Sequence, residues 1–171
     1  MPQSGKTQKA PARKSKFTPA GALIDIADTL YRTAASSCVE HRRYADLVEK
    51  GASDAEQKSA RYAVRASDDA LDEAVDLYEL ACLKESNHAD DPWWHKANLV
   101  WKAAKEYLQH HDSSNKMTRR GNAEQHGRAE LLELTIEYKL EASALLRLRH
   151  TIDAYREVRP EASGAMESAT P

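Results

Sequence analysis

Apolar side chains recur at intervals of three and four residues along four long segments of the chain. This spacing places the apolar positions on one face of a helix and is the seam pattern of a left-handed coiled coil. The predicted seams are Ile24, Ala27, Tyr31, Ala34, Cys38, His41, Ala45 and Val48; Ala60, Val64, Ser67, Leu71, Ala74, Tyr78 and Ala81; Trp93, Ala97, Val100, Ala104 and Tyr107; and Leu131, Leu134, Tyr138, Glu141, Leu145, Leu148, Ile152 and Tyr155.

Capping residues and helix breakers divide these segments. Thr18 followed by Pro19, and Asp91 followed by Pro92, each combine a cap with a proline at the first helical position. Ser53 with Glu56 forms a capping box, and Pro160 limits the last helix. We expect helices over about 19–50, 53–86, 92–111 and 121–159, with loop residues at 112–115. A break of the second helix near Ser67 stays open.

Short links between amphipathic helices force each helix to fold back on the one before it. The fold class that follows is all-α: an antiparallel four-helix bundle of long, coiled-coil-like helices over residues 18–160. We expect residues 1–17 to be a disordered basic arm and residues 161–171 a disordered tail. Aromatic residues make up only 6% of the chain, yet all three tryptophans lie within 93–101, so we expect the third helix to be the central packing element.

Charge is segregated along the chain although the net charge is only −2. Residues 1–17 carry +5, residues 53–91 carry −7 and residues 92–120 carry +4. The cations of the arm are Lys6, Lys9, Arg13, Lys14 and Lys16. Such an arm can contact nucleic acid or an acidic partner. We therefore take these five residues as the candidate partner or nucleic-acid contact, with a purely solubilising role as the alternative.

No apolar run reaches the roughly 20 residues needed to span a bilayer, and no apolar stretch follows the basic start as in a secretory signal. We therefore expect a cytoplasmic protein without a membrane span. Cys38 and Cys82 are too few for a disulfide framework or a zinc cluster.

Ligand patterns for metals are weak. Glu85 and His88 form the only Glu-x-x-His pair, whereas carboxylate-bridged metal bundles need two such pairs. We expect no metal and no cofactor, with a metal-binding bundle kept as a lesser alternative. His41 and Glu141 are notable because both fall on a predicted seam. A histidine facing a bundle interior can act as a ligand, as a pH-sensitive group, or as an ordinary hydrogen-bonded ring.

One pattern suggests an enzyme. Arg119 or Arg120 followed by His126 is similar to the Arg-x(4–6)-His motif of HEPN ribonucleases, which are all-helical bundles. The resemblance implies general acid/base chemistry by the histidine and stabilisation of phosphate charge by the arginine. A second likeness, of residues 72–81 to the second helix of a tetratricopeptide repeat, has no other copy in the chain at the required period of about 34 residues.

No glycine-rich phosphate loop and no Ser-His-Asp or Cys-His set supports another enzyme class. The leading hypothesis is a non-catalytic interaction or adaptor protein that binds a macromolecular partner through a helical surface, with the basic arm as an additional contact. Self-association is compatible with its apolar stripes. The HEPN-like ribonuclease is the alternative.

Overall fold

Four antiparallel helices make up the part of the chain that the structure describes, and the predicted all-α bundle is confirmed. The computed structural model describes residues 20–83, 90–120 and 127–159. The helices are α1 (Ala20–Glu49), α2 (Asp54–Cys82), α3 (Pro92–Arg120) and α4 (Arg128–Arg156), and no strand occurs within these ranges. The basic arm and the C-terminal tail predicted from the sequence lie outside the described residues.

A glycine and a capping serine form the turn between α1 and α2. Gly51 adopts a φ of 65°, a left-handed conformation that glycine tolerates because it has no Cβ. Ser53 then caps α2, since its side chain accepts a hydrogen bond from the Glu56 amide while the Glu56 carboxylate accepts one from the Ser53 amide. The predicted capping box is therefore confirmed. α2 is continuous, so the open question of a break near Ser67 is resolved.

The third helix is longer than predicted, and the loop expected at 112–115 is wrong. α3 continues through this polar stretch to Arg120. Ser and Asp are weak helix formers because their side chains compete for backbone groups. In α3 these side chains have other partners, so they do not compete for the helix backbone amides. Ser114 donates hydrogen bonds to the His111 carbonyl and to Glu141, and Asp112 pairs with Lys116.

Two other helix limits also differ from the prediction. α2 ends at Cys82 with Leu83 as its C-cap, before the predicted end at 86. α4 begins at Arg128, after Gly127, rather than at 121. Residues 84–86 and 121–126 of the predicted helices lie outside the described part of the chain.

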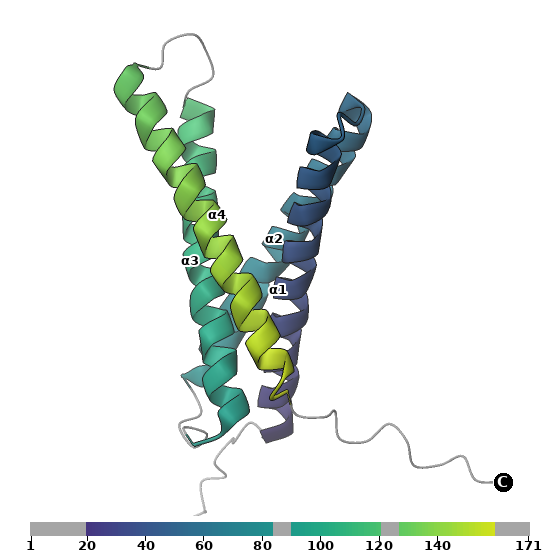
Figure 1. Ribbon diagram of the computed structural model, residues 1–171. Coiled ribbons are helices and arrows are strands. Elements are labelled where there is room, and N and C mark those ends of the chain that lie inside the picture. Colours follow the sequence, from purple (N-terminus) through teal and green to yellow (C-terminus); the bar gives the residue numbers. More distant parts are fainter. Residues whose placement is uncertain (1–19, 84–89, 121–126, 160–171) are drawn as a thin grey trace, which may run out of the picture.

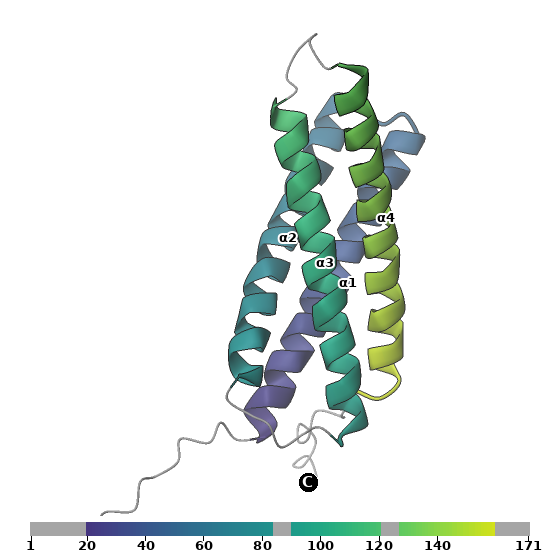
Figure 2. The same cartoon turned by 90° about the vertical axis from the view of Figure 1, so that its left-hand side faces the viewer.

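The helices are paired into two hairpins, α1 with α2 and α3 with α4 (Figure 1). The hairpins lie against each other near the start of α1 and the end of α4, and they diverge toward the α1–α2 turn. The view along the other direction shows the four helices running side by side (Figure 2). We call the end near the start of α1 the closed end and the end near Gly51 the open end.

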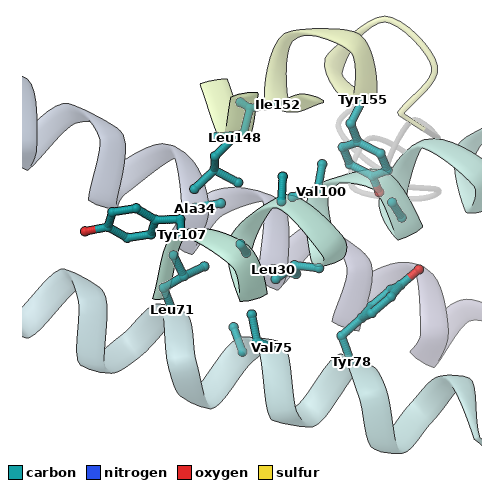
Figure 3. Packing of buried hydrophobic residues seen from close by; sticks show 14 of the residues in the cluster. Leu30, Ala34, Leu71, Val75, Tyr78, Val100, Tyr107, Leu148, Ile152 and Tyr155 are labelled. Atoms are coloured by element: carbon teal, nitrogen blue, oxygen red, sulfur yellow. The ribbon is translucent and has the colours of Figure 1, made fainter. Parts of the chain in front are cut away.

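The core occupies the closed end and the middle of the molecule. Leu30, Leu71, Val100 and Leu148, one from each helix, are fully buried or nearly so. Figure 3 shows these side chains gathered together with Ile152 and three tyrosines. The three tryptophans of α3 are partly buried against this cluster, and Tyr78 lies 5.8 Å from Trp94 between ring centroids. α3 therefore contributes much of the aromatic packing.

At the open end the predicted seams of α1 and α4 are not buried. Ala45 and Val48 on α1, and Leu131 and Tyr138 on α4, are exposed, whereas their heptad positions predict burial. The reason is that the hairpins diverge, so α1 and α4 no longer face each other at this height (Figure 1). The seam prediction therefore fails at this end for α1 and α4, whereas Ala60 and Val64 of the α2 seam are buried as predicted. At the closed end it fits most positions, but on α1 Leu23 and Leu30 are fully buried while the predicted Ile24 and Tyr31 are only partly buried.

Candidate functional site

The divergence of the hairpins leaves a cleft of about 990 Å³ between them. Its walls come from α1 and α2 on one side and from α3 and α4 on the other. Where the two walls meet, the lining residues include His41, Asp68, His111, Ser114 and Glu141. Together with Ser37 and Tyr107 these side chains form two hydrogen-bonded groups, one around Asp68 and one around Glu141, joined by a 3.5 Å ion-pair contact between His111 and Asp68. We call this set, drawn from all four helices, the vertex network.

Asp68 of α2 is the centre of the vertex network. It is only 5% exposed, although ionised side chains are rarely buried unless they are paired. Its Oδ1 accepts a hydrogen bond of 2.7 Å from the Ser37 hydroxyl of α1. Its Oδ2 accepts one of 2.9 Å from the Tyr107 hydroxyl of α3. Both carboxylate oxygens are therefore satisfied from neighbouring helices.

His41 of α1 joins the same carboxylate. Its Nε2 lies 3.0 Å from Asp68 Oδ2 and also contacts the Tyr107 hydroxyl. Because a carboxylate oxygen can only accept, Nε2 of His41 carries a proton in this arrangement. The Tyr107 hydroxyl donates to Asp68 and accepts from His41, so α1, α2 and α3 are linked through one oxygen atom.

His111 of α3 connects Asp68 to α4. Its Nδ1 lies 2.7 Å from Glu141 Oε1, and its Nε2 lies 3.5 Å from Asp68 Oδ2. Glu141 also accepts a hydrogen bond of 2.6 Å from the Ser114 hydroxyl. Nε2 of His111 has a further neighbour in the Asn115 amide nitrogen, at 2.9 Å. The imidazole of His111 thus stands between two carboxylates on different helices.

These contacts shift the titration of the network. Burial opposes ionisation of Asp68, but hydrogen bonds from His41 and Ser37 outweigh it and hold the pKa of Asp68 below its ordinary value. The pKa of Glu141 is lowered in the same way, because hydrogen bonds from His111 and Ser114 outweigh its burial. The hydrogen bond to Glu141 raises the pKa of His111. The ionised carboxylates of Asp68 and Glu141 and the protonated imidazole of His111 are therefore all favoured.

On α2 the cleft is lined by acidic side chains at the height of the vertex and on its closed-end side. Burial, reinforced by the neighbouring carboxylates of Asp76, Asp69 and Asp112, raises the pKa of Asp72. Arg61, Arg65 and Lys116 also line the cleft, so its charge is mixed. The Arg61 side chain donates to the Tyr44 hydroxyl at 2.9 Å, and its guanidinium lies over the Tyr44 ring, which places a cation at the mouth of the cleft.

The network can hold and exchange protons among two imidazoles, two carboxylates and a phenol. Although both histidines approach Asp68, no group of three or more His, Cys, Asp or Glu among the described residues could hold a metal ion. Cys38 and Cys82 are both free thiols. Burial raises the pKa of Cys38 to about 11, so this thiol stays protonated and unreactive near neutral pH.

The residues singled out from the sequence fall in different places. His41 and Glu141, noted for their seam positions, belong to the vertex network. Arg119 and Arg120 form the end of α3, and their side chains lie outside the described structure, as does His126. The structure therefore does not bring the HEPN-like set together or test it, and it stays a prediction. The arm residues Lys6, Lys9, Arg13, Lys14 and Lys16 also lie outside the described residues.

Sequence reasoning missed Asp68, Tyr107 and His111 as members of a site. Asp68 lies in the acidic segment 53–91, whose charge pattern does not distinguish it from its acidic neighbours. A signal was present, because Asp68 follows the buried Val64 by four residues and precedes the buried Leu71 by three, which places it on the buried stripe. His111 was assigned to a helix end because α3 was predicted to stop there.

A second surface stands out on α4. Three large apolar side chains spaced by four residues share its outer face, and we call them the α4 outer stripe: Leu132, Ile136 and Leu140, which are 61%, 48% and 39% exposed. Leu131 and Tyr138 are half exposed on the side of the helix toward the cleft. The first half of α4 therefore shows apolar residues on more than one face, whereas a surface helix normally carries a single apolar stripe.

In comparisons with known proteins, the chain matches no family model, no curated protein and no solved structure. Among the helices that the structure describes, none is apolar over a sufficient length to cross a membrane. Cytoplasmic location stays a prediction.

Proposed function

We propose that this protein is a non-catalytic interaction protein that binds an amphipathic helix of another protein through the first half of α4. The observation that carries the proposal is the exposure of the α4 outer stripe. A helix that is apolar on several faces is normally covered on all of them. Spacing by three and four residues is also the anchor pattern by which helices dock on one another.

The amount of apolar surface supports a protein partner. Six large apolar residues of α4 are more than a third exposed, which are Leu131, Leu132, Ile136, Tyr138, Leu140 and Leu146. They do not form one patch, because Leu131 and Tyr138 lie toward the cleft; the three residues of the α4 outer stripe present roughly 300 Å² at about 100 Å² for each half-exposed side chain, within the range of the apolar patches found on monomers. The stripe would supply the apolar centre of an interface whose standard size is roughly 800 Å² per side.

The test uses a matched pair of triple variants. Replacing Leu132, Ile136 and Leu140 by Gln removes the stripe and retains good helix formers. Replacing Leu77, Leu80 and Leu83 by Gln changes three comparably exposed leucines at the end of the other hairpin. After crosslinking and quantitative capture from the native host, we expect the first variant to lose its specific partner at least tenfold and the second to retain it. Equal capture by both variants would contradict the proposal.

The same variants address self-association. If sedimentation shows a dimer of the wild-type chain that only the α4 variant loses, the occupant of the stripe is a second copy and the partner assignment is wrong. The basic arm is tested separately by deleting residues 1–17 and titrating nucleic-acid binding against salt. Loss of affinity together with a shallower salt dependence supports an arm contact, because each phosphate contact contributes to the slope. Unchanged affinity removes this role.

A further inference from the structure

We propose that His111 is a pH-sensitive latch between the two hairpins. As an imidazolium it ties Asp68 of α2 to Glu141 of α4 and holds the cleft narrow. As a neutral imidazole it releases Asp68, accepts a hydrogen bond from Asn115 within α3 and lets the hairpins move apart. This inference does not depend on the partner surface of α4.

The His111 imidazole is positioned to contact both hairpins. Its Nδ1 is fixed by Glu141 at 2.7 Å, a contact inside the α3–α4 hairpin. Its Nε2 has two neighbours: Asp68 Oδ2 on the other hairpin at 3.5 Å, and Asn115 Nδ2 on the same helix at 2.9 Å. A protonated Nε2 can donate only to the carboxylate, whereas an unprotonated Nε2 can only accept and therefore pairs with the amide.

Loss of the Nε2 proton turns the contact between His111 and Asp68 from an attraction into a repulsion. In the charged form, the ring proton and the Asp68 carboxylate attract each other. In the neutral form, with Nδ1 still donating to Glu141, the Nε2 lone pair faces the carboxylate oxygen and the two repel. His111 lies one helical turn closer to the open end than Tyr107, so its contact with Asp68 lies nearer the open end than the hydrogen bond from Tyr107 to Asp68.

Charged and titratable groups from all four helices surround the His111 ring. Asp68 faces it from α2, Glu141 from α4 and Asp112 from its own helix, and all three carboxylates favour the imidazolium. His41 faces it from α1, with the ring centroids 5.9 Å apart, and Tyr107 stacks beside it on α3 at 5.7 Å. Three carboxylates therefore surround two imidazoles, and the raised pKa of His111 agrees with this balance.

The remaining cross-hairpin contacts explain why the latch changes an angle and does not separate the hairpins. Tyr107 donates to Asp68 and contacts His41 in either state of His111. At the closed end, Arg156 of α4 donates to the Tyr31 hydroxyl at 3.0 Å, and Arg159 pairs with Asp28. These contacts form a fixed base about which the open ends can move.

The experiment measures the distance between the open ends by pulsed electron resonance. Spin labels replace Lys58 on α2 and Glu133 on α4, which are both exposed and lie about 15 Å and 12 Å from the vertex along their helices. Cys82 is replaced by Ser, while buried Cys38 stays because its pKa of about 11 keeps it unreactive. Distances are compared at about pH 5.5 and about pH 8.5, where Asp and Glu stay ionised and an exposed imidazole changes charge.

We expect the modal distance to increase at the higher pH. A change of about 10° at the vertex moves labels at this range by roughly 2–3 Å. His111→Gln should give the same distance at both pH values, because its amide does not titrate. His110→Gln is the matched control: His110 is adjacent, but it pairs with Glu137 inside the α3–α4 hairpin, so the response should persist.

Three outcomes would overturn the latch. These are an unchanged distance in the wild-type chain, a His111→Gln variant that still responds to pH, and a response abolished by His110→Gln. If His111→Gln does not fold, the wild-type comparison decides the matter together with a magnetic resonance titration of the His111 ring. The midpoint of the distance change must coincide with the midpoint of that ring titration, and a separation between the two contradicts the proposal.

Discussion

Asp68 is a buried carboxylate whose cost of desolvation is offset by donors from two other helices. A lone buried charge is strongly unfavourable, whereas a charge that accepts several hydrogen bonds can remain ionised. Ser37, Tyr107 and His41 supply these bonds to Asp68. The consequence is that each partner depends on the carboxylate, since removing it leaves buried donors without an acceptor.

Replacing Asp68 by Asn should therefore destabilise the fold by about 2–4 kcal/mol, the usual cost of breaking a buried charged pair and leaving its partners unsatisfied. Asp69→Asn is the matched control, because Asp69 is exposed and repels Asp72. Its effect should stay within about 0.5 kcal/mol. Urea unfolding of both variants checks the prediction, and equal losses of stability would contradict it.

The titrating groups of the vertex network also predict how stability depends on pH. His111 has a raised pKa in the folded state, so its contribution is complete below the ordinary value of 6.5 and is lost as the pH rises through the folded value. Asp68 and Glu141 have lowered pKa values, so their contributions are complete above the ordinary 3.8 and 4.5 and are lost as the pH falls through the folded values.

The free energy of unfolding should consequently be greatest between pH 4.5 and 6.5 and decline on the alkaline side. Urea titrations across this range measure it. His111→Gln should remove most of the loss of unfolding free energy above pH 6.5. The loss of unfolding free energy at acid pH, which is due to the carboxylates, should remain. A wild-type stability that rises steadily above pH 6.5 would show that the imidazolium is not part of the folded network.

At the residue level the sequence could indicate only part of this site. His41 and Glu141 were recognisable because each interrupts an apolar seam. Asp68 was not, because it stands beside Asp69 and Asp72, and an acidic run is usually solvated. Tyr107 was predicted as a core residue, and it is one, with a buried ring. Its hydroxyl function depends on which helices face each other, and periodicity does not specify that.

At the scale of the helices, local signals predicted starts better than ends. The capping box at Ser53 and the proline at 92 mark the observed starts of α2 and α3. The end of α3 was misjudged because Asp112, Ser113 and Ser114 resemble a loop in composition. Tertiary contacts of this segment, such as the hydrogen bond from Ser114 to Glu141, favour the helix instead. Such contacts override propensity and leave no local trace in the sequence.

The capping box provides a prediction for a single helix. Ser53→Ala removes the acceptor for the Glu56 amide and should destabilise the protein by about 1 kcal/mol. Ser59→Ala, six residues further along the exposed side of α2, should be neutral or slightly stabilising, because alanine is the best helix former. Thermal unfolding of the two variants measures these opposite signs, and a similar loss in both would show that the cap contributes nothing specific.

At the scale of the whole molecule, the four heptad seams predict a bundle packed along its full length, and the closed end meets that expectation. Toward the open end the walls of the cleft carry Arg61 and Arg65 on α2 and Lys116 on α3, which favour contact with water. The hairpins therefore stay together where apolar rings and aliphatic side chains meet, and they part where charged side chains line both walls. The seams specify each hairpin, and the polar groups specify where the hairpins separate.

The contrast between the packed closed end and the separated open end predicts a gradient of local stability along the helices. Backbone amides of residues 27–38, 71–81, 97–107 and 144–155 belong to the packed part, in which side chains from all four helices are buried together. Residues 42–49, 55–63, 112–118 and 130–137 belong to the open arms, where each helix packs on its hairpin partner alone. Fewer buried apolar contacts lower the free energy of local opening.

Hydrogen exchange under native conditions should therefore be at least tenfold faster in the arms than in the packed part, a difference of about 1.4 kcal/mol in opening free energy. Raising the pH should widen the difference once the chemical exchange rate is corrected, because neutral His111 no longer links the hairpins. His110→Gln should leave the gradient as it is. Uniform protection along all four helices would mean that the arms are held together in solution and that the cleft is closed there.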